Sequence, residues 1–172
     1  SLKKVLDQSL DFAIGLWEFL PSELDALHLG DDEALVALPK HHPLAKHDTI
    51  QMAKLAHDPW INLPGGYNSA LQNRFRQLTL NAGFVPRRQQ TVPDSWTVML
   101  LVGLGMGASL TLSSVASAVP ADDVKFLTVE DASNKPLPLR LVWRRDVLNP
   151  VLETVIDTAT DLFGHRQPGP HV

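Results

Sequence analysis

The segment that decides how this chain folds is residues 35–45, LVALPKHHPLA. Its first four residues are all apolar, which is typical of a strand buried on both faces, as in a parallel sheet. Pro39 and Pro43 lack the amide donor that a central strand needs, so the ladder of hydrogen bonds must end here. The segment therefore predicts a buried strand that runs directly into a turn.

The composition predicts a folded protein without cysteine chemistry. The chain has 172 residues, of which 44% are hydrophobic, enough for the core of one domain or of two small lobes. A net charge of −4 argues against a surface that holds nucleic acid by itself, because phosphate binding requires clustered Lys and Arg. The absence of cysteine excludes disulfides and thiolate zinc sites and is compatible with a reducing cytoplasm. No apolar stretch is long enough to span a bilayer, so we expect no membrane partner.

Apolar runs and helical patterns alternate along the chain, which predicts an α/β fold with a largely parallel sheet. Asp94 or Ser95 is expected to cap a helix over residues 96–102, and Asn149 to cap a last helix. The glycines of residues 103–107, GLGMG, follow a helix and open a strand, the reverse of the order in a dinucleotide-binding fingerprint. We therefore expect a tight turn with positive φ here, and no cofactor.

No set of residues assembles a catalytic or metal site. His41 and His42 are expected to be exposed turn residues, because zinc requires three or four converging ligands. Ser109 falls in a predicted strand and lacks the Gly-x-Ser-x-Gly elbow of hydrolases. The acidic pairs 31–32 and 122–123 are expected to lie in solvated loops.

The loop of residues 64–69, PGGYNS, is the strongest candidate for a binding site. It precedes a helix, so its backbone amides and the helix dipole can receive an anion. Residues 94–96, DSW, form a second polar helix start, and in an α/β sheet both starts lie at the carboxyl ends of strands, where ligands bind. Together they would suit a small carboxylate, provided that Asp94 faces away from it or pairs with a cation. The alternative for both segments is a simple capped helix start.

Four segments, in order, resemble the effector-binding domain of LysR-type transcriptional regulators. Residues 10–14, LDFAI, are similar to the family's L-D-x-[AG]-[IF] strand. Residues 33–39 and 42–45 resemble its crossover, E-x-L-v-x-v-l-P followed by H-P-L-A. Residues 101–106, LVGLGM, resemble its glycine segment, and residues 142–146, VWRRD, resemble the strand that returns before the last helix.

The resemblance implies two Rossmann-like lobes of the periplasmic-binding-protein type 2 fold, the first of them incomplete. Residues 1–38 with 143–164 would form the first lobe and residues 39–142 the second, and we expect residues 165–172 to be a disordered tail. The residues that the resemblance places in two hinge strands between the lobes are Leu35, Val36, Ala37, Leu38, Val142 and Trp143.

The resemblance also implies a function. A small organic acid, for example an aromatic one, would bind between the lobes and change the conformation of a dimer or tetramer. Promoter DNA would be contacted through a helix-turn-helix domain that precedes Ser1 in the family and is absent from this chain, and neither catalysis nor a metal is expected. The residues assigned to effector binding are Gly65, Gly66, Tyr67, Asn68, Ser69, Ser95, Trp96 and Trp17.

Two other classes of protein remain open. A solute-binding protein of a transporter shares the two-lobed architecture, and an upstream helix-turn-helix in the longer sequence would distinguish the regulator from it. An α/β enzyme, such as a hydrolase or transferase, would show turnover that one substitution in the cleft abolishes.

Overall fold

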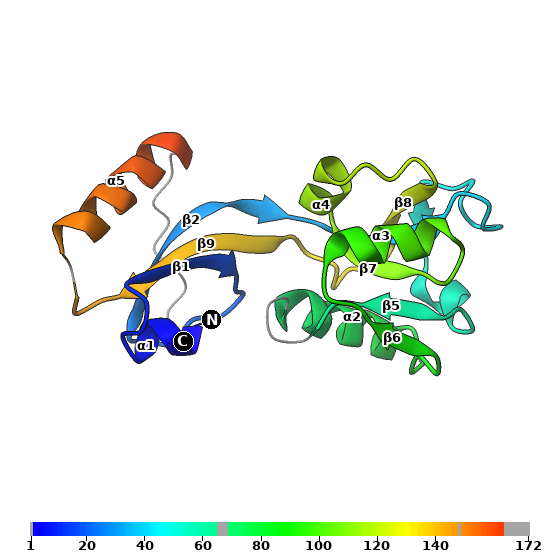
Figure 1. The fold of residues 1–172 in the computed structure, drawn as a ribbon. Coiled ribbons are helices and arrows are strands. Elements are labelled where there is room, and N and C mark those ends of the chain that lie inside the picture. Colours follow the sequence, from blue (N-terminus) through cyan, green and yellow to red (C-terminus); the bar gives the residue numbers. More distant parts are fainter. Residues whose placement is uncertain (1, 65–68, 148, 164–172) are drawn as a thin grey trace. The chain divides into compact units, whose positions relative to one another are not determined.

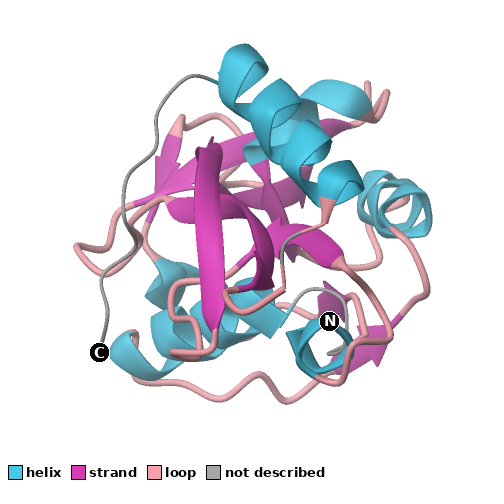
Figure 2. Cartoon of the chain, turned by 90° about the vertical axis from the view of Figure 1, so that its left-hand side faces the viewer, coloured by secondary structure: helices cyan, strands magenta, loops and turns pink. Residues whose placement is uncertain are grey.

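The computed structural model describes residues 2–64, 69–147 and 149–163, and the chain divides into two compact units. Unit 1 comprises Ser1–Asp32 and Leu137–Val172, and unit 2 comprises Glu33–Pro136. The chain therefore passes between the units after Asp32 and after Pro136, whereas the sequence had suggested boundaries after Leu38 and Val142. Each unit contains both helices and strands (Figures 1 and 2).

Unit 1 is built on a three-stranded antiparallel sheet with β9 (Leu137–Arg144) between β1 (Phe12–Leu16) and β2 (Leu24–Asp32). The short helix α1 (Leu2–Leu6) contacts β1 and β9, and α5 (Pro150–Phe163) packs on β2. The apolar positions of α5 recur every three or four residues, which gives the helix one face for the sheet. The core residues that the sheet and α5 share are Leu27, Leu141, Trp143, Leu152 and Ile156.

Unit 2 contains a four-stranded sheet in the order β4–β8–β3–β7 and a parallel pair, β5–β6. Its strands are β3 (Ala34–Pro39), β4 (Thr49–Ile50), β5 (Trp60–Asn62), β6 (Gln89–Thr91), β7 (Ser109–Leu112) and β8 (Val124–Val129). Its helices are η1 (Met52–Leu55), α2 (Ser69–Asn81), α3 (Ser95–Gly103) and α4 (Ser113–Ala118). One core cluster, which includes residues of α3, consists of Ala37, Ile61, Val98, Met99, Val102 and Val124.

The apolar run of residues 35–38 forms the central part of β3, and Val36, Ala37 and Leu38 are fully buried. The prediction of a strand buried on both faces is therefore confirmed. The expected parallel arrangement is wrong for this strand, because β3 pairs antiparallel with both β7 and β8. A continuous apolar run indicates that both faces of a strand are buried. This burial is the same whether the neighbouring strands run parallel or antiparallel.

Strand β2 was not anticipated from the sequence. Only Leu24 and Leu27 are buried in it, and a bulge between His28 and Gly30 interrupts the alternation of inward and outward side chains. The acidic pair 31–32 consequently ends β2 and does not lie in a loop, whereas the pair 122–123 occupies a turn as expected.

The two histidines of the turn after β3 differ in how far their side chains are exposed. His41 is exposed, as expected, but the side chain of His42 is only 17% exposed. Nδ1 of His42 accepts a hydrogen bond from the Leu44 amide at 3.1 Å, and Nε2 lies 3.1 Å from the Asp58 carboxylate. His42 is therefore a structural residue that holds the turn, because both ring nitrogens have partners inside unit 2.

Candidate functional site

Of the residues assigned to effector binding, the structure describes Ser69, Ser95, Trp96 and Trp17. Ser69 is the first residue of α2 and Ser95 the first of α3, and both helices follow the carboxyl ends of the parallel strands β5 and β6. This is the position at which α/β proteins bind ligands. The four loop residues of the assignment, Gly65, Gly66, Tyr67 and Asn68, lie outside the described residues.

The start of α3 is a capped helix start. The Asp94 carboxylate accepts hydrogen bonds from the Thr97 amide and from the Thr97 hydroxyl, both at 2.9 Å. These hydrogen bonds, the backbone one first, hold the pKa of Asp94 below its usual value. A negative charge of the chain itself therefore already interacts with the N-terminal end of α3.

The two tryptophans of the assignment belong to different units. Trp17 follows β1 in unit 1, and its ring covers Gly15, where a Cβ atom would stand 2.8 Å from the ring. Trp96 lies in the first turn of α3 in unit 2 and is 61% exposed. The hinge residues lie inside β3 of unit 2 and β9 of unit 1, and both strands begin within two residues of a point where the chain crosses.

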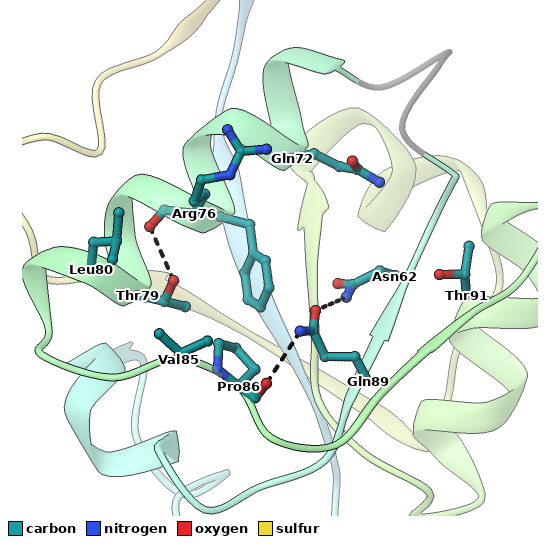
Figure 3. A pocket seen from close by; sticks show the side chains of 10 residues that line it. Asn62, Gln72, Arg76, Thr79, Leu80, Val85, Pro86, Gln89 and Thr91 are labelled. Atoms are coloured by element: carbon teal, nitrogen blue, oxygen red, sulfur yellow. Dashed lines mark hydrogen bonds between the residues drawn. The ribbon is translucent and has the colours of Figure 1, made fainter.

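A hollow of about 520 Å³ lies within unit 2, between α2 and the strand β6, and we call it the α2–β6 hollow (Figure 3). Helix α2 contributes residues of its second to fourth turns, and the chain that leads into β6 closes the opposite side. The lining residues are Asn62, Gln72, Phe75, Arg76, Thr79, Leu80, Val85, Pro86, Gln89 and Thr91.

The hollow has an apolar end and an amide end. At the apolar end, Leu80 from α2 lies across from Val85 and Pro86 (Figure 3). Phe75 is 9% exposed and packs against the buried ring of Trp60, with the ring centroids 4.8 Å apart. Both aromatic rings are therefore fixed by the core of unit 2.

Hydrogen bonds fix the amide end of the hollow. Gln89 accepts a hydrogen bond from the Asn62 side chain at 2.9 Å and donates one to the Pro86 carbonyl at 3.2 Å (Figure 3). Gln72 donates from its side chain to the Leu63 carbonyl. The amide end therefore offers preformed polar groups to a ligand.

The segment that supplies the whole lining, residues 59–93, has four arginines and no Asp or Glu, although the complete chain has a net charge of −4. Arg74 is buried and bonds to Asn134 and to the Lys135 carbonyl, and Arg88 bonds to the His57 carbonyl at 3.0 Å. Arg76 lines the hollow, and its guanidinium donates to the neutral side chain of Asn73 at 3.3 Å. Arg76 is therefore the arginine of this segment that can present its charge to the hollow.

The described residues contain no group of three or more His, Cys, Asp or Glu side chains that could hold a metal ion. In the same residues, no helix is long and apolar enough to cross a membrane. The arrangement in unit 2 is suited to reversible binding of an organic anion, through amides, a guanidinium and apolar side chains.

The α2–β6 hollow was missed by the sequence reasoning. Its signal is present as the segment without carboxylates, but Phe75, Arg76 and Gln89 are brought together only when α2 folds back beside β6.

The fold defines a class: a mixed α/β protein of the periplasmic-binding-protein type 2 kind, as in the effector-binding domains of transcriptional regulators. Residues 1–164 match the model of the LysR substrate binding domain, and the chain belongs to this family. The family and fold expected from the four sequence segments are thereby confirmed.

Individual relatives agree with this assignment. The HTH-type transcriptional regulator ShiR of Corynebacterium glutamicum (strain R) is 33% identical over 141 residues, which cover 82% of this chain and 47% of ShiR. The chain spans about half the length of ShiR and of two further curated regulators that it matches, TtuA of Agrobacterium vitis and HcaR of Escherichia coli (strain K12).

Two solved structures share the fold. The effector-binding domain of QuiR in complex with shikimate has a TM-score of 0.77 at 20% identity and covers 94% of this chain and 76% of that chain. The BenM effector-binding domain with its effector benzoate has a TM-score of 0.75 at 15% identity and covers 99% of this chain and 79% of that chain.

Proposed function

We propose that this chain is the effector-sensing domain of a LysR-type transcriptional regulator and that it binds a small organic acid, aromatic acids included, between its two lobes. The observation that carries the proposal is the family match over residues 1–164. Shikimate and benzoate, the ligands named for two proteins of the same fold, are both carboxylates, which supports an acid as the ligand. The regulator names of the curated relatives support a sensor and not an enzyme.

The proposed effector contacts are the loop Gly65–Asn68, Ser69 at the start of α2, Ser95 and Trp96 on α3, and Trp17 in the first lobe. The start of α2 offers amides to a carboxylate, whereas Asp94 occupies that position at α3, so α2 would bind the negative end of the effector. Ser95 and Trp96 would then contact the uncharged part.

Coupling to transcription requires that the effector bind one arrangement of the lobes more tightly than another. The chain crosses between the lobes after Asp32 and after Pro136, and the proposed hinge strands adjoin these points. In the longer protein, the two arrangements would present helix-turn-helix domains differently within a dimer or tetramer. Promoter DNA would then be contacted by those domains, in the cytoplasm.

A thermal-shift assay tests the proposal on the longer regulator. Shikimate and benzoate, each compared with its neutral amide, should raise the free energy of unfolding, by about 2.7 kcal/mol at one hundred times Kd. Ser69→Ala and Ser95→Ala should reduce the shift produced by the acid. Ser117→Ala, an exposed serine of α4, is the matched control and should leave it unchanged. Equal shifts for acid and amide, or turnover of the ligand, would contradict the proposal.

A further inference from the structure

The geometry of unit 2 points to a second ligand site. We propose that the α2–β6 hollow binds an organic monocarboxylate with an apolar body, independently of the helix starts to which the effector is assigned. This inference goes beyond the proposed function, because that function requires both lobes, whereas every lining residue of the hollow belongs to unit 2.

The apolar end of the hollow is distant from the start of α2, although Gln72 at the amide end is only three residues from Ser69. Its α2 residues recur at helical spacing from Gln72 to Leu80, so the hollow follows one face of the helix. Leu80 lies eleven residues beyond Ser69, which corresponds to about 16 Å along the helix axis. A ligand at the apolar end would therefore be out of reach of the amides at the helix start.

The apolar end suits a ring or a short hydrocarbon. Leu80 and Val85 are 60% and 70% exposed and lie across from each other at this end of the hollow (Figure 3), which Phe75 also lines. An apolar body between them would remove exposed apolar surface from water on both sides, which favours binding. The volume of about 520 Å³ lies within the range of about 300–1,000 Å³ found for small-molecule sites.

The charge of the hollow selects a monoanion. Arg76 is the one charged residue among the described lining residues, and within the described part of the chain no carboxylate forms an ion pair with it. A guanidinium presents paired donors that match a carboxylate, and the single charge of Arg76 balances one carboxylate but not a dianion. The side chains of Gln72, Asn62 and Gln89 can accept or donate beside it.

The test is a titration of the isotopically labelled chain with benzoate, followed by backbone amide chemical shifts. Benzoate should shift the amides of Thr79, Val85 and Gln89, and benzamide, its neutral counterpart, should bind about tenfold more weakly because it lacks the charge. Arg76→Gln should weaken benzoate binding by about the same factor. Arg87→Gln, an exposed arginine of the same segment that does not line the hollow, should leave the affinity within about twofold.

A second variant tests the hollow with a substitution that should leave the chain folded. Val85→Asp adds a negative charge at an exposed position of the rim, and it should weaken benzoate binding while the remaining amide spectrum stays unchanged. The inference is overturned if benzoate shifts none of the three hollow amides up to about 10 mM, the range of weak specific binding. It is also overturned if Arg76→Gln and Arg87→Gln have equal effects. Shifts confined to Ser69 and Ser95 would overturn the second site and leave the proposed effector site supported.

Discussion

Gly107 illustrates how one missing Cβ atom determines the connection between two strands of unit 2. A Cβ atom at this position would stand 2.6 Å from the Pro59 carbonyl oxygen. That same oxygen accepts a hydrogen bond from the Ala108 amide at 2.8 Å, and the Ala108 carbonyl accepts one from Ile61 at 2.8 Å. Glycine is therefore required here because the backbones of residues 59–61 and 107–108 approach each other closely.

We expect Gly107→Ala to lower the free energy of unfolding by about 1–3 kcal/mol more than Gly30→Ala, because it forces a backbone displacement. Gly30 is the matched control: its φ of 155° is close to the 159° of Gly107, but nothing lies within 4 Å of a Cβ atom there. Chemical denaturation of both variants measures the difference. Equal losses would show that the conformation, and not the contact with Pro59, is the reason for glycine.

Helix α5 shows how a capping residue sets the start of an element. The Asn149 side-chain oxygen accepts a hydrogen bond from the Leu152 amide at 2.9 Å, and Pro150 occupies the first helical position. The predicted N-cap is confirmed. The cap fixes the register that turns Leu152 and Ile156 towards the sheet of unit 1.

Replacing Asn149 by alanine should destabilise unit 1 by about 1 kcal/mol, because the Leu152 amide loses its acceptor. Asn149→Ser keeps an acceptor oxygen for the Leu152 amide without placing a second carboxylate beside Asp11, whose oxygen lies 3.5 Å from the Asn149 side-chain nitrogen, and it should recover most of that loss. Hydrogen exchange of the first turn of α5 reports the effect directly. An alanine variant with unchanged exchange would show that the helix start is held by packing alone.

On the scale of the whole molecule, each unit has a core of its own. Leu141 is fully buried in β9 of unit 1, and Leu127 is equally buried in β8 of unit 2. The cluster around Leu141 and the cluster around Val98, both described above, each draw their residues from a single unit. Such an organisation is typical of parts that fold as separate cooperative units.

Leu141→Ala should therefore lower the free energy of opening of β1, β2 and β9 by about 2–5 kcal/mol and leave β3, β7 and β8 nearly unchanged. Leu127→Ala is the matched variant, and it should lower the free energy of opening of β3, β7 and β8 while leaving β1, β2 and β9 nearly unchanged. Hydrogen exchange with mass spectrometry distinguishes the two sets of strands. If either variant lowered protection in both units alike, the chain would unfold as one cooperative body.

The sequence alone predicted the features that depend on local chemistry. Asn149 and Pro150 determined the start of α5, and Asp94 determined the start of α3. The apolar run of β3 indicated its burial, and Gly105, with φ of 79°, forms the expected tight turn. These features are local because capping, burial pattern and positive φ each depend on a few neighbouring residues.

Only the tertiary structure decided the features that depend on distant segments. The antiparallel pairing of β3 with β7 and β8 could not be inferred, since a doubly buried strand has the same apolar pattern in either direction. Strand β2 was hidden by its bulge, because one additional residue disrupts the two-residue period. The α2–β6 hollow joins residues that are up to 29 positions apart, from Asn62 to Thr91, so its shape exists only after α2 has packed beside β6. The sequence therefore determined the family, the caps and the buried strand, whereas strand direction, the crossing points and the hollow arise from long-range packing.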